Sequence, residues 1–171
     1  MSTDRSDRVY FSWLDSAAKF DYYVTGVALA LVGFLGATFT IGRFGLNPST
    51  LELGALGAFL AATIVGFKHL ESQVSFLSAM HRRLYEEESA GAIASAASQG
   101  RTMLNTSTGR VYSTLQLVEQ LYSHKVGTTA ASERLDELVV ILKRRYRNRN
   151  AFLLGGFCLL VLARILPAIL P

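Results

Sequence analysis

The chain has 171 residues, of which half are hydrophobic, and a formal net charge of +4. Its single cysteine excludes an intrachain disulfide framework. The apolar residues gather in blocks instead of recurring at period two or 3.6, which excludes an ordinary soluble domain with one amphipathic core.

Three stretches are almost free of charge: residues 22–41, 51–67 and 151–166. A helix needs about 20 apolar residues, with a range of about 17–25, to cross the hydrocarbon core of a bilayer. The first stretch meets that length, the second is at its short end, and the third reaches it by continuing past Arg164. The sequence therefore predicts an all-α integral membrane protein with three transmembrane helices. The expected organisation is an interfacial helix over 1–20, a transmembrane hairpin over 21–68, a cytoplasmic helical region over 69–150 with a flexible linker at 89–109, and a third transmembrane helix over 151–171.

The placement of positive charge predicts the orientation. Eleven of the 17 Lys and Arg residues lie between 69 and 150, whereas the connection between the first two spans holds only Arg43. Positive residues near span ends stay in the cytoplasm. We therefore expect the N-terminus inside and the C-terminus outside, and an N-terminus unlike a transit peptide favours the bacterial plasma (inner) membrane.

Five cations are concentrated just before the third span: Lys143, Arg144, Arg145, Arg147 and Arg149. They are interpreted either as a plain topology anchor for this span or as contacts to anionic lipid headgroups. A nucleic-acid contact is the weaker interpretation, because Tyr146 alone offers a ring within the run on which a base can stack.

Small residues recur at helical spacing in the first two spans. The sets are Gly26, Ala30, Gly33 and Ala37 in the first span, and Gly54, Ala58, Ala62 and Gly66 in the second. Membrane helices associate where small residues let their backbones approach closely. These faces are therefore expected to pack against each other in an antiparallel hairpin.

Glu52 and Arg164 are candidates for a charge pair within the membrane. Glu52 opens the second span, and Arg164 lies in the outer half of the third span on the same side. An arginine in hydrocarbon is costly unless it reaches the interface or finds a partner. Arg164 is therefore expected to snorkel outward, to pair with Glu52, or to line an aqueous path. Glu52 has a second interpretation, as part of a capping box with Ser49.

The region between the second and third spans carries heptad-like apolar spacing typical of coiled coils. One series continues out of the second span through Val74, Leu77 and Leu84, and another follows the linker with Leu115 and Tyr122. A helix break is expected at 127–129, followed by a last helix that leads into the third span. The spacing predicts a small cytoplasmic helical bundle.

The sequence contains no constellation typical of catalysis. The three histidines, His69, His81 and His124, have no ligand partner at the spacing of a metal site. Neither a glycine-rich phosphate loop nor a nucleophile elbow is present. We therefore expect no enzyme and no catalytic, cofactor-binding or metal site.

Two functional hypotheses remain. The preferred one is a non-enzymatic, self-associating membrane protein, with a pore or membrane-perturbing effector in its spans and a cytoplasmic helical module for sensing or assembly. The alternative is an accessory or scaffold subunit of a larger membrane complex. The expected partners are membrane lipid and either further copies of this chain or the other subunits of such a complex.

Overall fold

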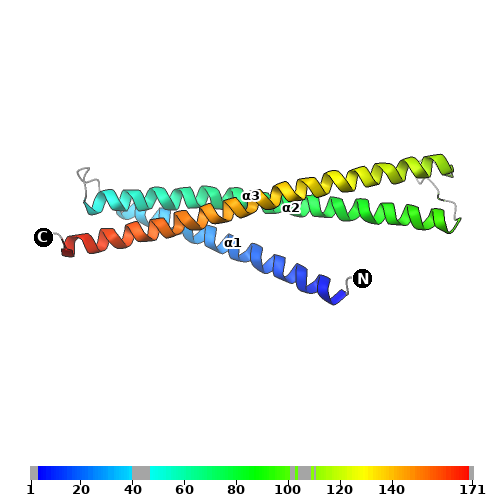
Figure 1. Cartoon of the computed structure of the whole chain (residues 1–171). Helices are drawn as coiled ribbons and strands as arrows, with labels where there is room; N and C mark the ends of the chain where they lie inside the picture. Colours follow the sequence, from blue (N-terminus) through cyan, green and yellow to red (C-terminus); the bar gives the residue numbers. More distant parts are fainter. Residues whose placement is uncertain (1–3, 40–46, 101–102, 104–108, 110, 170–171) are drawn as a thin grey trace. The chain divides into compact units, whose positions relative to one another are not determined.

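In the computed structural model, the described residues, which are 4–39, 47–100, 103, 109 and 111–169, form an all-α structure (Figure 1). It contains helices α1 (Asp4–Thr38), α2 (Pro48–Ser98) and α3 (Thr114–Ile169). Each of the three is long and apolar enough to cross a membrane. The predictions of an all-α fold and of three segments able to span a membrane are confirmed.

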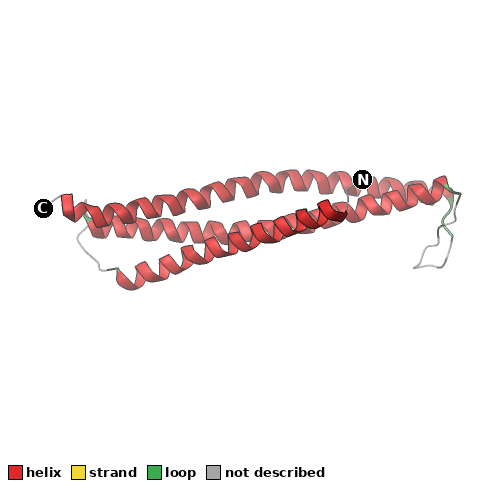
Figure 2. Ribbon diagram, turned by 90° about the horizontal axis from the view of Figure 1, so that it is seen from below, coloured by secondary structure: helices red, strands yellow, loops and turns green. Residues whose placement is uncertain are grey.

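The chain divides into two compact units. The three-helix unit contains residues 1–73 and 141–171, and the two-helix unit contains residues 74–140. Helices α2 and α3 contribute to both units, whereas α1 belongs to the first alone. Figure 2 shows that helix accounts for nearly all of the described residues.

Helix α1 differs from the expectation of an interfacial helix over 1–20 followed by a separate span. It continues without interruption from Asp4 through Asp21 to Thr38. The first proline of the chain is Pro48, so nothing in this segment removes a backbone donor or clashes with the preceding turn. Residues 1–3 lie outside the described residues, as do residues 40–46 of the loop expected at 42–50.

Helix α2 begins at an asparagine cap instead of the expected Ser49 capping box. Asn47 Oδ1 accepts hydrogen bonds from the backbone N–H and the hydroxyl of Thr50, both at 3.0 Å. Pro48 occupies the first helical position, where a missing N–H does no harm. The helix thus starts earlier than expected, and its cap does not need the Glu52 side chain.

Helix α2 also extends into the segment expected to be a flexible linker. It ends at Ser98, and Gly100 follows with φ = +63°. A left-handed residue at this place is the usual end of a helix and favours glycine. The alanine-rich first half of 89–109 is therefore helical, and most of the second half lies outside the described residues.

Helix α3 begins with a capping box and passes through the expected break. Ser113 Oγ accepts from the N–H of Gln116 at 3.3 Å, and the Gln116 side chain accepts from the N–H of Ser113 at 2.9 Å. At Gly127 the helix continues, and a Cβ there would lie 2.8 Å from Cδ of Glu86. The glycine therefore allows a close approach of α2 and α3 within the two-helix unit.

The core of the three-helix unit is built around Phe59, which is fully buried. Phe59 forms one cluster with Leu35 of α1 and Ala55 of α2. Its ring faces Gly156 of α3, where a Cβ would lie 2.8 Å from Phe59 Cε1. The core of the two-helix unit consists of smaller contacts, with Ile93, Ala131, Leu135 and Leu138 buried.

Candidate functional site

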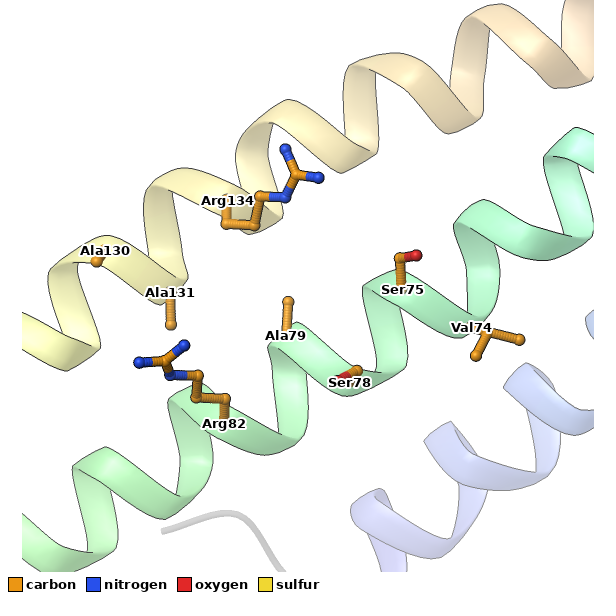
Figure 3. Close-up of a pocket in the computed structure, with 8 residues that line it drawn as sticks. All are labelled: Val74, Ser75, Ser78, Ala79, Arg82, Ala130, Ala131 and Arg134. Atoms are coloured by element: carbon orange, nitrogen blue, oxygen red, sulfur yellow. The ribbon is translucent and has the colours of Figure 1, made fainter.

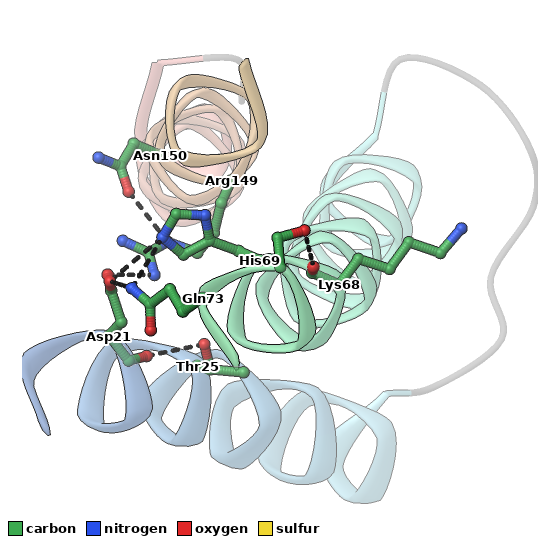
Figure 4. Close-up of polar contacts among 8 residues, drawn as sticks. Asp21, Thr25, Lys68, His69, Gln73, Arg149 and Asn150 are labelled. Carbon is green, nitrogen blue, oxygen red and sulfur yellow. Dashed lines mark hydrogen bonds and ion pairs between the residues drawn. The ribbon is translucent and has the colours of Figure 1, made fainter. Parts of the chain in front are cut away.

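The three-helix unit contains a buried polar cluster, defined here as Asp21 of α1, His69 and Gln73 of α2, and Arg149 of α3 (Figure 4). Arg149 is fully buried and Asp21 is 5% exposed. Nη1 of Arg149 lies 2.7 Å from Oδ1 of Asp21. A buried arginine and aspartate are therefore joined across the unit in a charge-assisted hydrogen bond.

The second oxygen of the Asp21 carboxylate contacts two side chains of α2. Oδ2 lies 3.2 Å from Nε2 of His69 and accepts from Nε2 of Gln73 at 2.5 Å. An ionised carboxylate only accepts hydrogen bonds, so the contact with His69 requires the proton on Nε2. Asp21 thus ties α1 to both other helices. Both oxygens of the Asp21 carboxylate are therefore occupied by contacts with α2 and α3.

Further contacts fix the orientation of the Arg149 guanidinium. Its Cζ lies 5.1 Å from the ring centroid of Tyr146, within the range of a cation–π interaction. Its Nε donates to the side-chain oxygen of Asn150 at 3.2 Å. Arg149 Nη2 and His69 Nδ1 are buried without a hydrogen-bond partner among the described residues.

The basic run before the third span is divided by the structure. Arg149 belongs to the buried polar cluster, and Arg145 donates to the carbonyl of Lys68 and the hydroxyl of Ser72. The remaining cations of the run, Lys143, Arg144 and Arg147, are exposed. The sequence analysis treated these five residues as one group. A four-residue spacing between Arg145 and Arg149 is the signal that could have identified the inward-facing pair.

The structure brings Glu52 and Arg164 together. Nη2 of Arg164 lies 3.4 Å from Oε1 of Glu52, which matches the pairing interpretation. The Glu52 side chain is 20% exposed and that of Arg164 is 68% exposed, so the guanidinium stays on the surface of the three-helix unit. Arg164 is therefore both paired with Glu52 and largely exposed.

The small residues of α2 take part in contacts within the unit. A Cβ at Gly66 would lie 2.7 Å from Oγ1 of Thr25 in α1, and one at Gly54 would lie 3.3 Å from Cδ1 of Leu159 in α3. Ala62 is fully buried and Ala58 is half-buried. At these positions α2 approaches both neighbouring helices.

The small residues of α1 lie on the opposite side from the helix contacts. Gly26, Ala30, Gly33 and Ala37 are all exposed, and a Cβ at either glycine would meet no atom within 4 Å. Among the side chains of α1 whose burial the structure describes, the buried ones are Asp21, Thr25, Ala28 and Leu35. The small-residue face of α1, defined by those four exposed residues, therefore has no partner among the described residues.

A pocket of about 510 Å³ lies within the two-helix unit (Figure 3). Its lining is formed by Val74, Ser75, Ser78, Ala79, Arg82, Ala130, Ala131 and Arg134. Both guanidinium groups have acidic neighbours, because Arg134 Nη1 lies 2.7 Å from Glu137 and Arg82 Nε lies 4.0 Å from Glu86. The pocket therefore presents little uncompensated positive charge to an anionic ligand.

The three histidines have different environments. His69 belongs to the buried polar cluster, His81 is exposed, and Nδ1 of His124 lies 2.6 Å from Oε2 of Glu86. Within the described part of the chain, no group of three or more His, Cys, Asp or Glu side chains is arranged to hold a metal ion.

Comparisons with protein-family models, with curated proteins and with solved structures give no match. A functional proposal therefore depends on the residues of this chain alone.

Proposed function

We propose that the chain is a non-enzymatic integral membrane protein that self-associates, with its N-terminus in the cytoplasm and its C-terminus outside. Residues 69–150 act as a cytoplasmic assembly or sensing module. The assembled spans act as a pore or as a membrane-perturbing effector in the bacterial plasma membrane. The proposal concerns a homo-oligomer, because the surfaces that support it all belong to this chain.

The observation that carries the proposal is the presence of two exposed apolar stripes on the two-helix unit, one on each helix. These outer stripes are Leu77 and Leu84 on α2, and Leu115, Val118, Tyr122 and Val126 on α3. Leu115 is 79% exposed and Tyr122 is 70% exposed. Charged residues recur along the same helices, as expected of segments in water. Large exposed apolar patches on soluble segments mark interaction surfaces.

The geometry of the helices explains why the outer stripes stay uncovered. Glu86 and His124 contact each other, so they mark the facing sides of α2 and α3. Leu84 and Tyr122 each precede one of these residues by two positions, which is about 200° around a helix. Burial of the outer stripes against other copies would contribute about 25 cal/mol per Å² of apolar surface.

The small-residue face of α1 supports association in the membrane as well. Exposed apolar side chains are ordinary against lipid, but a row of glycine and alanine is the feature that permits close helix approach there. Because α2 and α3 contact the other side of α1, this face is free to contact a second copy. Arg164, which is largely exposed, would then lie near a neighbouring chain or an aqueous path.

The test is the mass and composition of the particle purified in mild detergent after expression at the native level. A homo-oligomer that dissociates when Leu115 and Tyr122 are both replaced by glutamate supports the proposal. Glutamate at Gln120, which is also exposed on α3, is the matched control and should leave the oligomer intact. A stable monomer, both in detergent and in lipid, would contradict self-association. Other subunits at a fixed ratio would support the accessory-subunit alternative instead.

A further inference from the structure

A second pocket, called the cationic groove here, lies within the three-helix unit between α2 and α3. Its volume is about 330 Å³. Its lining consists of Val65 and Lys68 from α2 and Ile141, Arg144, Arg145 and Asn148 from α3. The cationic groove therefore combines three cations, one amide and two aliphatic side chains.

The positive charge of the cationic groove is uncompensated. No acidic residue lines it, and no ion pair joins Lys68 or Arg144 to a carboxylate in the described parts of the chain. The nearby Asp21 carboxylate is already paired with Arg149 inside the buried polar cluster. Figure 4 shows the Lys68 side chain extending away from that cluster. The cationic groove thus has a net positive charge, whereas the charges of the buried polar cluster beside it compensate each other.

The donors of the cationic groove are partly preorganised for an anion. Hydrogen bonds to the Lys68 carbonyl and the Ser72 hydroxyl hold the Arg145 guanidinium against α2. The planar, multi-donor head of arginine matches phosphate geometry, and a lysine adds a compact point charge. The Asn148 amide supplies a further donor at the same place.

The apolar part of the lining indicates the kind of phosphate. Val65 lies one turn before Lys68 and belongs to the apolar block 51–67, and Ile141 lies on the facing helix. Val65 therefore marks the end of the groove that adjoins a candidate span, and the cations lie between it and Ile141. Basic pockets of this kind between membrane helices receive anionic lipid headgroups.

We propose that the cationic groove binds the phosphate headgroup of an anionic phospholipid, with Lys68, Arg144 and Arg145 on the phosphate and the acyl chains alongside Val65. A free phosphate would make the same contacts with the cations, but it has no acyl chain to lie against the aliphatic side chains of the lining. The site rests on the proposed membrane location and is independent of self-association.

The test uses the full chain in a neutral detergent, and native mass spectrometry counts the lipids bound to each chain. The probes are phosphatidylglycerol, phosphatidylcholine and soluble glycerol phosphate. The wild-type protein should prefer phosphatidylglycerol over both other probes. The double variant Lys68→Gln/Arg144→Gln should bind it at least tenfold more weakly, because each cation near a headgroup contributes substantially to affinity.

The matched control is Lys143→Gln/Arg147→Gln, which removes the same charge from exposed positions outside the cationic groove. It should retain the wild-type affinity within about twofold. Equal losses in the two double variants would overturn the proposal, as would equal affinity for phosphatidylcholine. Glycerol phosphate bound as tightly as the lipid would assign the groove to a free phosphate. Flotation of the wild-type chain with pure phosphatidylcholine vesicles tests the membrane location separately.

Discussion

Arg149 and Asp21 form a buried ion pair between residues 128 positions apart, with 2.7 Å between Nη1 and Oδ1. The pair joins the start of the apolar part of α3 to α1 at the place where the first apolar stretch begins. Removal of two charges from water is costly, and their attraction offsets this cost only while both partners are present. The pair therefore makes the register of α1 against α3 sensitive to either residue.

The first prediction concerns the loss of one partner. Replacement of Asp21 by leucine should destabilise the three-helix unit by about 3–5 kcal/mol, because Arg149 would become an uncompensated buried charge. Addition of Arg149→Met should recover most of this loss by removing that charge. Thermal unfolding in detergent measures both, and Lys143→Met, at an exposed position of the same run, is the control. Additive losses in the double variant would contradict the coupling.

The three helices that are long and apolar enough to span a membrane were predictable from the sequence, whereas the buried polar cluster was not. Long blocks without charge can hardly be anything but candidate spans, since length and composition suffice to identify them. Asp21 and Arg149 each stand at the end of such a block, where charged residues are ordinarily solvated. Their burial depends on how three helices meet, and the spacing along any one helix does not report this.

The second prediction concerns the contact of α1 with α2 at Gly66. A methyl group there would lie 2.7 Å from Oγ1 and 2.9 Å from Cγ2 of Thr25. Thr25 is β-branched, and its hydroxyl donates to the Asp21 carbonyl at 2.8 Å. Its side chain therefore cannot easily rotate away from an added methyl group. Gly66→Ala should therefore cost about 1–3 kcal/mol of stability, measured by thermal unfolding.

Gly57→Ala is the control for this experiment, because no atom lies within 4 Å of its Cβ position. It should be neutral or stabilise α2 by up to about 1 kcal/mol through helix propensity. Combination of Gly66→Ala with Thr25→Ala should relieve most of the clash. Equal effects of the two glycine substitutions would show that the contact with Thr25 does not decide the outcome.

The third prediction uses two adjacent glycines of α3. A Cβ at Gly156 would lie 2.8 Å from the ring of Phe59, whereas one at Gly155 would meet nothing within 4 Å. Gly156→Val should displace the fully buried Phe59 ring and lower the unfolding temperature strongly, while Gly155→Val should change it little. A similar shift for both variants would indicate a general effect of β-branching on the helix.

Which face of each helix is buried was harder to infer from the sequence than where the helices lie. Heptad spacing through Val74, Leu77 and Leu84 predicted a packed seam, yet the structure leaves these side chains exposed. The contact side of α2 in the two-helix unit includes Glu86 and the buried Ile93 instead. Apolar spacing identifies a face that prefers burial, but it does not say whether the partner belongs to the same chain.

The fourth prediction concerns Arg164 and depends on the proposed pore. In an oligomer whose aqueous path passes Arg164, rings of arginine would favour anions. Glu52 compensates part of this charge through its contact at 3.4 Å. Arg164→Leu should therefore shift selectivity toward cations, and Glu52→Gln should shift it toward anions. The reversal potential across vesicle-derived bilayers in asymmetric KCl measures both changes.

Opposite shifts from the two partners distinguish an electrostatic role in conduction from a structural one. Because the Arg164 guanidinium is largely exposed, the pair contributes at most about 1 kcal/mol to stability, and neither variant should lose its fold or its oligomer. The double variant Glu52→Gln/Arg164→Leu should have a selectivity between those of the two single variants. Lys143→Leu removes an exposed charge 21 positions before Arg164 on α3 and should leave the reversal potential unchanged. If both single variants conduct with wild-type selectivity, Arg164 does not face the path of the ions, and the pair serves only to join α2 to α3.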